Sequence, residues 1–190
     1  MSETTQIQPK RPMRADARRN YDKLVATARE VYAVEGTSAP LEEIAKRADV
    51  GIGTLYRHFP TRQDLLEAVY AEEIGRMAAA ARALAGRDPW EALSAWLREY
   101  VGFAATKKAL TEALLEADPD SDVLVACRTA LLGAGNELIE RAQAAGAVRS
   151  DTTFTDVGRL ISGVAVVPTI DDAQRERLID LALDSLRYTG

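Results

Sequence analysis

The chain has 190 residues, of which 47% are hydrophobic and 28% are charged. This balance fits one or two folded domains and excludes an intrinsically disordered chain. No apolar run reaches the length of a bilayer span, so we expect no membrane association. The net charge is −5, yet residues 10–62 hold 11 Lys or Arg against 7 Asp or Glu, whereas residues 63–190 hold 13 against 21. A basic N-terminal third on an acidic remainder predicts a small, local contact with nucleic acid.

The N-terminal segment lacks the apolar core of a signal peptide, and the single cysteine, Cys127, allows no internal disulfide. We therefore expect a protein of the reducing cytoplasm. Residues 1–13 contain Pro9 and Pro12 and are predicted to form a flexible arm. The basic residues of this arm either reach DNA or remain in solvent.

A long first helix is predicted over residues 14–35, with an apolar stripe that includes Leu24 and Val31 and with Gly36 just past its end. Arg14 and Arg18 lie four residues apart and therefore share one face of this helix. Two interpretations of this pair stay open: a clamp on the DNA backbone, or an ordinary solvated face.

Two short helices are predicted over residues 41–59, joined by a tight turn at Asp49-Val50-Gly51. We expect Gly51 to adopt the backbone angles that the turn needs. In the second helix Leu55 and Phe59 point to the interior. The opposite face carries groups that can contact base edges or phosphates: Ile52, Gly53, Thr54, Tyr56, Arg57 and His58. This is the pattern of a helix-turn-helix whose second helix is the recognition helix.

A capping box, Thr61-x-x-Asp64, opens a further helix over about residues 61–85. The body beyond it is predicted to be helical throughout, at about 88–106, 107–117, 121–145, 153–167 and 171–188. The whole chain therefore reads as an all-α protein of about nine helices. The expected helix starts are Asp88-Pro89, Thr153-x-x-Asp156 and Asp171.

Residues 14–70 resemble the N-terminal DNA-binding domain of the TetR/AcrR transcriptional regulators. The resemblance rests on L-E-E-I-A at 41–45, V-G at 50–51, T-L-Y-R-H-F at 54–59 and T-R-Q-D-L-L at 61–66. It implies a helix-turn-helix domain at 14–60 and a ligand-binding and dimerisation domain at 61–190. It also implies a ligand-responsive regulator, a repressor that a small-molecule effector releases from a near-palindromic operator in double-stranded DNA.

The resemblance implies that Tyr56, His58 and Arg62 contact phosphates. We expect Thr54 and Arg57 to contact base edges. A guanidinium at Arg57 can bond guanine through two donors. Ile52 either touches a thymine methyl group or packs in the turn. The sequence departs from the family where a Thr or Ser usually caps the second helix, since Ala39 and Pro40 stand there. Proline suits the first helical position and Ser38 is the alternative cap, which leaves a phosphate contact at this point open.

Aromatic and sulfur side chains gather on the middle helices: Met77, Trp96, Tyr100, Phe103 and Cys127. They either pack in the core or line a ligand cavity, and the resemblance favours a cavity for the effector.

The last two helices carry wide apolar faces: Val157, Leu160, Ile161 and Val164 on one, and Leu178, Ile179, Leu181 and Leu186 on the other. Part of each face must pack within one subunit. The resemblance implies that the rest forms a homodimer, which places two recognition helices about one turn of DNA apart.

Signals for catalysis are missing from the sequence. The one histidine and the one cysteine are far apart, no histidine–carboxylate cluster suggests a metal, and no glycine-rich phosphate loop follows a strand. We therefore predict no catalytic residue, no metal and no cofactor. Two alternatives to a ligand-responsive regulator stay open: a constitutive or architectural DNA binder without an effector, and an all-helical carrier or enzyme.

Overall fold

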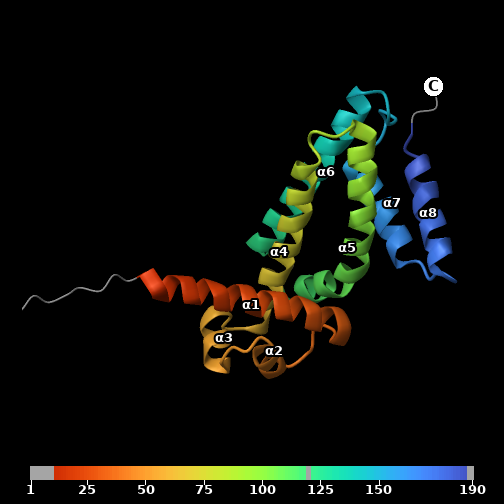
Figure 1. Cartoon of the computed structure of the whole chain (residues 1–190). Coiled ribbons are helices and arrows are strands. Elements are labelled where there is room, and N and C mark those ends of the chain that lie inside the picture. Colours follow the sequence, from red (N-terminus) through yellow and green to blue (C-terminus); the bar gives the residue numbers. More distant parts are fainter. Residues whose placement is uncertain (1–10, 119–120, 188–190) are drawn as a thin grey trace, which may run out of the picture. The chain divides into compact units, whose positions relative to one another are not determined.

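The computed structural model describes residues 11–118 and 121–187, with the side chains of all of these except 11–14, 105 and 106. The described residues form α-helices linked by turns, together with one isolated bridge between Val148 and Arg187 (Figure 1). The expected all-α class is confirmed. The chain divides into two compact units, residues 1–69 and residues 70–190.

The first unit contains α1 (Arg11–Glu35), α2 (Leu41–Arg47), α3 (Ile52–His58) and the start of α4 (Arg62–Ala83). In Figure 1, α1 runs across both short helices. Leu24, Ile44 and Leu55 are fully buried, one from each of the first three helices, so the predicted apolar stripes do meet in one core. Helix α1 ends as predicted at Glu35, and Gly36 follows with φ +83°. Of the predicted arm, residues 1–10 lie outside the described part, and residues 11–13 already belong to α1.

The turn between α2 and α3 differs from the expectation in one detail. Gly51 has φ −60° and ψ 138°, which any residue can adopt, and it is Asp49 that takes the left-handed conformation, with φ +52°. The prediction for Gly51 was therefore wrong. Aspartate is among the few residues other than glycine that tolerate this region, because its short polar side chain bonds locally.

The start of α2 also differs. Pro40 is the residue before the first helical turn, and no side chain caps this helix, neither from Pro40 nor from Ser38. The prediction placed Pro40 as the first residue inside the helix, whereas the helix begins one residue later, at Leu41. Its fixed φ of −61° with extended ψ suits the entry to the helix equally well.

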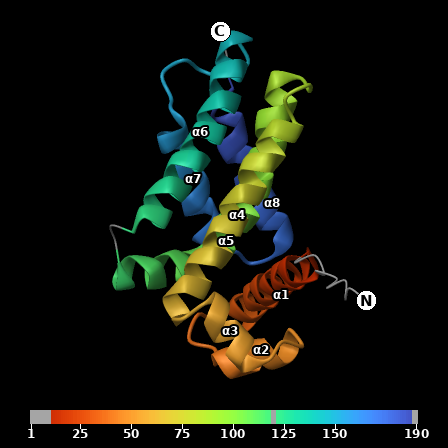
Figure 2. The ribbon, with the colours of Figure 1, turned by 90° about the vertical axis from the view of Figure 1, so that its left-hand side faces the viewer.

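The second unit holds most of α4, then α5 (Pro89–Ala117), α6 (Asp122–Ala144), α7 (Phe154–Val166) and α8 (Asp172–Asp184) (Figure 2). Two predicted segments, 88–106 and 107–117, form one continuous helix, α5, whose second part runs in a different direction from its first (Figure 1). None of the described helices is both long enough and apolar enough to cross a membrane.

The predicted helix starts are confirmed by their hydrogen bonds. The Asp88 carboxylate accepts from the backbone N–H groups of Trp90 and Glu91 at 3.0 and 3.1 Å. Thr61 and Asp64 form a reciprocal capping box at α4, as Thr153 and Asp156 do at α7. The Asp171 carboxylate accepts from the Gln174 N–H at 2.7 Å at the start of α8. These caps satisfy N–H groups that a helix start otherwise leaves without a partner.

An aromatic cluster forms the centre of the second unit. Trp96 is fully buried, stacks on Tyr100 at 5.8 Å between ring centroids, and contacts Phe154 at 5.3 Å. Its indole N–H donates to the Met77 carbonyl at 2.8 Å, so that α5 is tied to α4. The cluster joins α5 to α7, and Tyr100 carries the contact from this core to the cavity described below.

Candidate DNA-binding face and ligand cavity

One face of α3 is exposed. Leu55 and Phe59 bury the opposite face. Tyr56 is 43% exposed and Arg57 is exposed, and within the part of the chain that the structure describes neither side chain forms a hydrogen bond or an ion pair. Ile52 is 39% exposed, Gly53 is exposed, and Thr54 is half-buried beside them. A tyrosine hydroxyl and a guanidinium thus extend from α3 with no partner among the described residues.

An aromatic contact joins the end of α3 to α1. The His58 ring lies edge-on to Tyr21, with 6.0 Å between centroids, and Tyr21 also packs on Phe59 at 5.1 Å. The Arg18 guanidinium lies 5.6 Å from the centre of the Tyr21 ring and pairs with Asp22 at 2.8 Å. The structure therefore brings Arg18 and His58 to one surface. The side chain of Arg14 lies outside the described residues.

Arg62 occupies a structural position. Its guanidinium donates to the backbone carbonyls of Thr37, at 3.0 Å, and of Ala39, in the segment that leads into α2. The same guanidinium lies beside Tyr32, where it partly offsets the burial that raises the pKa of that phenol to about 12. Arg62 thus anchors the start of α4 to the entry of the helix-turn-helix, and its expected phosphate contact stays a prediction.

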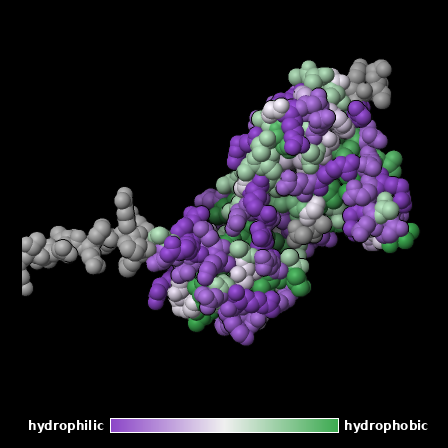
Figure 3. Space-filling view, viewed as in Figure 1, coloured by the Kyte–Doolittle hydropathy of each residue, from purple (hydrophilic) through white to green (hydrophobic). Residues whose placement is uncertain are grey.

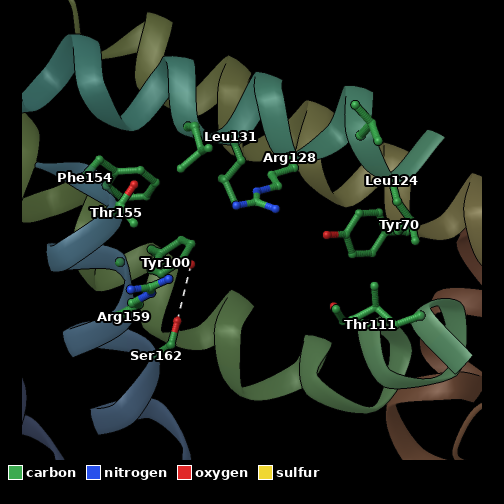
Figure 4. A pocket seen from close by; sticks show the side chains of 14 residues that line it. Tyr70, Tyr100, Thr111, Leu124, Arg128, Leu131, Phe154, Thr155, Arg159 and Ser162 are labelled. Atoms are coloured by element: carbon green, nitrogen blue, oxygen red, sulfur yellow. Dashed lines mark hydrogen bonds between the residues drawn. The ribbon is translucent and has the colours of Figure 1, made fainter. Parts of the chain in front are cut away.

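A cavity of about 490 Å³ opens in the second unit, with walls from four helices: α4, α5, α6 and α7. Its apolar wall includes Leu124, Leu131 and Phe154. Figure 4 shows the Tyr70 phenol and the Arg128 guanidinium extending into the same space, and the Tyr100 hydroxyl bonded to Ser162 at 3.4 Å. The volume and the mostly apolar lining with a few polar groups are typical of a small-molecule site.

A second cavity of about 480 Å³ adjoins the first and shares Tyr70, Tyr100, Thr111, Leu131 and Ser162 with it. Lys107 lines this second cavity. It is only 5% exposed, and its ammonium lies 3.8 Å from the centre of the Tyr70 ring and 3.5 Å from that of Phe103. Burial lowers the pKa of Lys107 from 10.5 to about 7, and burial also raises the pKa of the Tyr70 phenol.

The five residues predicted for ligand binding lie in different surroundings. Tyr100 lines both cavities and Phe103 lines the second. Met77 lines a smaller cavity of about 250 Å³ together with Phe103. Trp96 and Cys127 are buried and line none of the three.

Sequence reasoning missed the four positively charged residues of the cavity walls: Lys107, Lys108, Arg128 and Arg159. A signal for two of them was present. Lys107 falls in the apolar series Phe103, Leu110 and Leu114, and Arg128 falls between Leu124 and Leu131, all at helical spacing. A cation inside an apolar stripe is therefore the pattern that marks this site.

The predicted interface residues of α7 and α8 divide into three groups. Val157, Ile161, Ile179 and Leu186 are buried within the single chain. Val164 and Leu178 are half-buried, while Leu160 and Leu181 are 45% and 65% exposed. Val166, Val167 and Ile170, which were not predicted, add exposed apolar surface at the α7–α8 connection, where Figure 3 shows a patch of hydrophobic atoms.

Two parts of the chain match known protein families. Residues 24–69 match the family described as bacterial regulatory proteins, tetR family, and residues 88–188 match the C-terminal domain of SbtR-like transcriptional regulators. The chain is 31% identical over 126 residues to the HTH-type transcriptional repressor KstR of Rhodococcus jostii, a match that covers 65% of this chain but only 58% of the repressor.

Two solved structures match over nearly their whole length. The TetR transcriptional regulator SCO0520 of Streptomyces coelicolor is 40% identical, with a TM-score of 0.74, covering 90% of this chain and 99% of the other. A TetR transcription regulatory protein of Mycobacterium vanbaalenii is 37% identical, with a TM-score of 0.74, covering 93% and 100%.

Proposed function

Because this chain belongs to the TetR family, whose members are transcriptional regulators and not enzymes, we propose that it is a repressor that binds a near-palindromic DNA operator as a homodimer and is released by a small-molecule effector. Such a protein acts on DNA in the cytoplasm. The observation that carries the proposal is the exposed face of α3, where Tyr56 and Arg57 have no partner among the described residues.

The chemistry of this face suits DNA. Arg57 supplies two donors in the geometry that guanine accepts in the major groove, and Tyr56 supplies a hydroxyl for a phosphate. Gly53 supports a close approach, because a Cβ added there would meet no protein atom within 4 Å. Arg18 and His58 on the adjoining surface add donors for the DNA backbone.

Dimerisation follows from the size of this face. Helix α3 has seven residues and can read only a few base pairs, so useful specificity needs two copies about one turn of DNA apart. The exposed apolar residues of α7 and α8, Leu160 and Leu181 among them, supply a surface for a second copy of the chain. The proposed domain division is a DNA-reading part at 14–60 and a ligand-binding and dimerisation part at 61–190.

The cavity favours a ligand-responsive protein over a constitutive DNA binder. One of its wall residues, Tyr70, belongs to α4, and the same helix begins at Arg62, whose guanidinium holds the entry to α2. An effector that prefers one position of α4 would therefore act on the DNA-reading part. By linkage, effector and operator then weaken each other's binding by the same factor, which is limited by the effector's preference between the two states.

The test is selection of binding sites from random duplex DNA by the purified full-length protein, followed by titration of the selected site at several salt concentrations. We expect an inverted repeat with half-sites about one turn apart and a steep loss of affinity with salt. Failure to enrich any sequence contradicts the proposed reader. Once an effector is known, equal effector affinity with and without operator in calorimetry would contradict the release mechanism.

A further inference from the structure

The two adjoining cavities are lined by cationic side chains that form no ion pair with any described residue. Arg128 and Arg159 line the first cavity and Lys107 lines the second. Among the residues that the structure describes, none of these three side chains forms an ion pair or a hydrogen bond. Of the described wall residues, Glu112 is the one carboxylate, and it already faces Lys108 at 4.0 Å.

The positive charge of the cavity walls is opposite in sign to the net charge of the second unit. Residues 70–190 contain 13 Lys or Arg and 19 Asp or Glu, so an average surface of this unit is acidic. The described lining of the first cavity, in contrast, holds two arginines and no carboxylate. A cavity with the opposite sign from its surroundings concentrates anions.

Lys107 is the strongest evidence for an anionic ligand, because burying its ammonium without a counter-ion costs free energy. Its ammonium is buried between the Tyr70 and Phe103 rings, which attract a cation but do not neutralise it. Buried charges in proteins are normally paired. The groups that face it are Glu73 on α4, which pairs with Arg76, Cys127 on α6, and Lys108 and Glu112 on its own helix. Glu73 acts on Lys107 electrostatically, but among the described residues no carboxylate forms an ion pair with this ammonium, and an acid group on a ligand could supply one.

Tyr70 connects this ammonium to the first cavity. One face of the phenol lies under Lys107, and Figure 4 shows its hydroxyl opposite the Arg128 guanidinium. Away from this point leucines and Phe154 form most of the wall of the first cavity, and Thr155, Arg159 and Ser162 of α7 add polar groups. The site thus has a cationic end at Tyr70 and a mostly apolar body between α6 and α7, with Arg159 as the one charged residue of that body.

We propose that the effector is an amphipathic organic anion whose acid group binds between Lys107 and Arg128 and whose hydrocarbon part fills the cavity between α6 and α7. This inference rests on the proposed function for its link to DNA, but the binding itself is independent of DNA. A bound anion favours the charged form of Lys107, so binding takes up a proton when the free amine is neutral. Because burial brings the pKa of Lys107 to about 7, affinity for the anion falls as the pH rises from 7 to 9.

Direct binding tests the proposal. In a Trp90→Phe variant the remaining tryptophan, Trp96, stacks on Tyr100 and reports on the cavity wall. Straight-chain carboxylates of eight, twelve and sixteen carbons are added to this variant while the fluorescence of Trp96 is followed. The methyl ester and the primary amine of the twelve-carbon chain serve as the neutral and cationic counterparts. We expect the acid to bind and the ester and amine to bind at least about tenfold more weakly.

Two substitutions localise the acid group. Lys107→Met should weaken carboxylate binding by about tenfold or more and leave ester binding unchanged. Lys108→Met is the matched control, since it removes the same charge from the next residue on the same cavity but from an exposed ammonium. Lys107→Arg should keep the affinity and remove its decline between pH 7 and 9, because a guanidinium stays charged.

The outcomes separate the two proposals. Absence of carboxylate binding at every chain length, equal binding of acid and ester, or full affinity in Lys107→Met overturns the anion inference. If the ester releases the operator as well as the acid does, the proposed function stands without it. If the acid binds through Lys107 but leaves operator affinity unchanged, the inference stands and the release mechanism fails.

Discussion

The ring of Phe154, the first residue of α7, lies against the backbone of Gly135 in α6. A Cβ built on Gly135 would lie 2.3 Å from Cγ of that ring, closer than two such atoms can approach. The same ring contacts Trp96 and lines the first cavity. Because Gly135 has no side chain, Phe154 can pack directly against the backbone of α6, and this contact sets the position of one wall of the first cavity.

Replacing Gly135 by alanine should destabilise the second unit by about 1–3 kcal/mol, because the Phe154 ring must move out of a packed core. Urea unfolding measures the change. Gly133→Ala is the control, since this glycine is exposed on the same helix and its Cβ would meet no atom within 4 Å. The control should gain up to about 1 kcal/mol from the better helix former.

Gly53→Ala should have opposite effects on folding and on DNA binding. The residue is helical and its Cβ would occupy open space, so alanine should raise the free energy of unfolding by roughly 0.5–1 kcal/mol. At the DNA surface the added methyl group should lower operator affinity. A substitution that leaves affinity unchanged would show that DNA does not approach the backbone at this point.

Arg57→Ala should reduce discrimination between the selected operator and the same site with its contacted guanine replaced, by roughly 1–3 kcal/mol. Competition binding at fixed salt measures this ratio. Arg47→Ala is a suitable comparison, because that guanidinium pairs with Glu35 and Glu43 at 2.6 and 2.9 Å. Equal loss on both sites in Arg57→Ala would assign the residue to phosphate instead of base contact.

Lys107 should make the stability of the second unit depend on pH. Below pH 7 the amine is charged in both the folded and the unfolded chain, and the cost of burying it is fully present. Between the folded pKa of about 7 and the ordinary lysine pKa of 10.5, only the unfolded chain binds the proton, so the free energy of unfolding rises with pH.

The substitution Lys107→Met removes this dependence. At pH 6 the variant should be more stable than the wild type by on the order of 3 kcal/mol, and the difference should shrink towards pH 10. Thermal unfolding across this range measures it. A constant difference would mean that the buried amine does not change its charge.

Leu181→Glu should weaken the homodimer without unfolding the chain, because the side chain is 65% exposed on α8. Sedimentation velocity at several concentrations reads the oligomeric state. The contrasting variant is Ile179→Glu, which places a charge in the interior, where Ile179 is 4% exposed, and should unfold the unit. A Leu181→Glu protein that remains dimeric places the interface elsewhere.

Much of the fold could be predicted because its signals are local. The helix starts at Thr61, Asp88 and Thr153 follow from capping chemistry, and the helix end at Gly36 follows from the left-handed backbone of that glycine. The prediction for the turn was wrong at one residue. Aspartate and glycine both tolerate positive φ, and the sequence Asp49-Val50-Gly51 contains one of each, so the sequence alone could not decide between them.

The cavity was harder to predict because its walls come from distant parts of the chain. Helical spacing groups Trp96 with Tyr100, but only packing against Met77 and Phe154 decides that the indole is core and the phenol faces the cavity. Likewise, the sequence motif identified Arg62 by its position in the family pattern. Its hydrogen bonds to the carbonyls of Thr37 and Ala39 could not be predicted, because they depend on the folded geometry.

The walls of the first cavity come from four helices of residues 70–190, whereas the proposed reading surface occupies the seven residues of α3. These two sets share no position, so ligand preference and operator preference can diverge along separate mutational paths. If the proposed effector site is used in an engineered biosensor, substitutions at Leu124, Leu131 or Arg128 should change which ligand is recognised and leave the recognised operator the same.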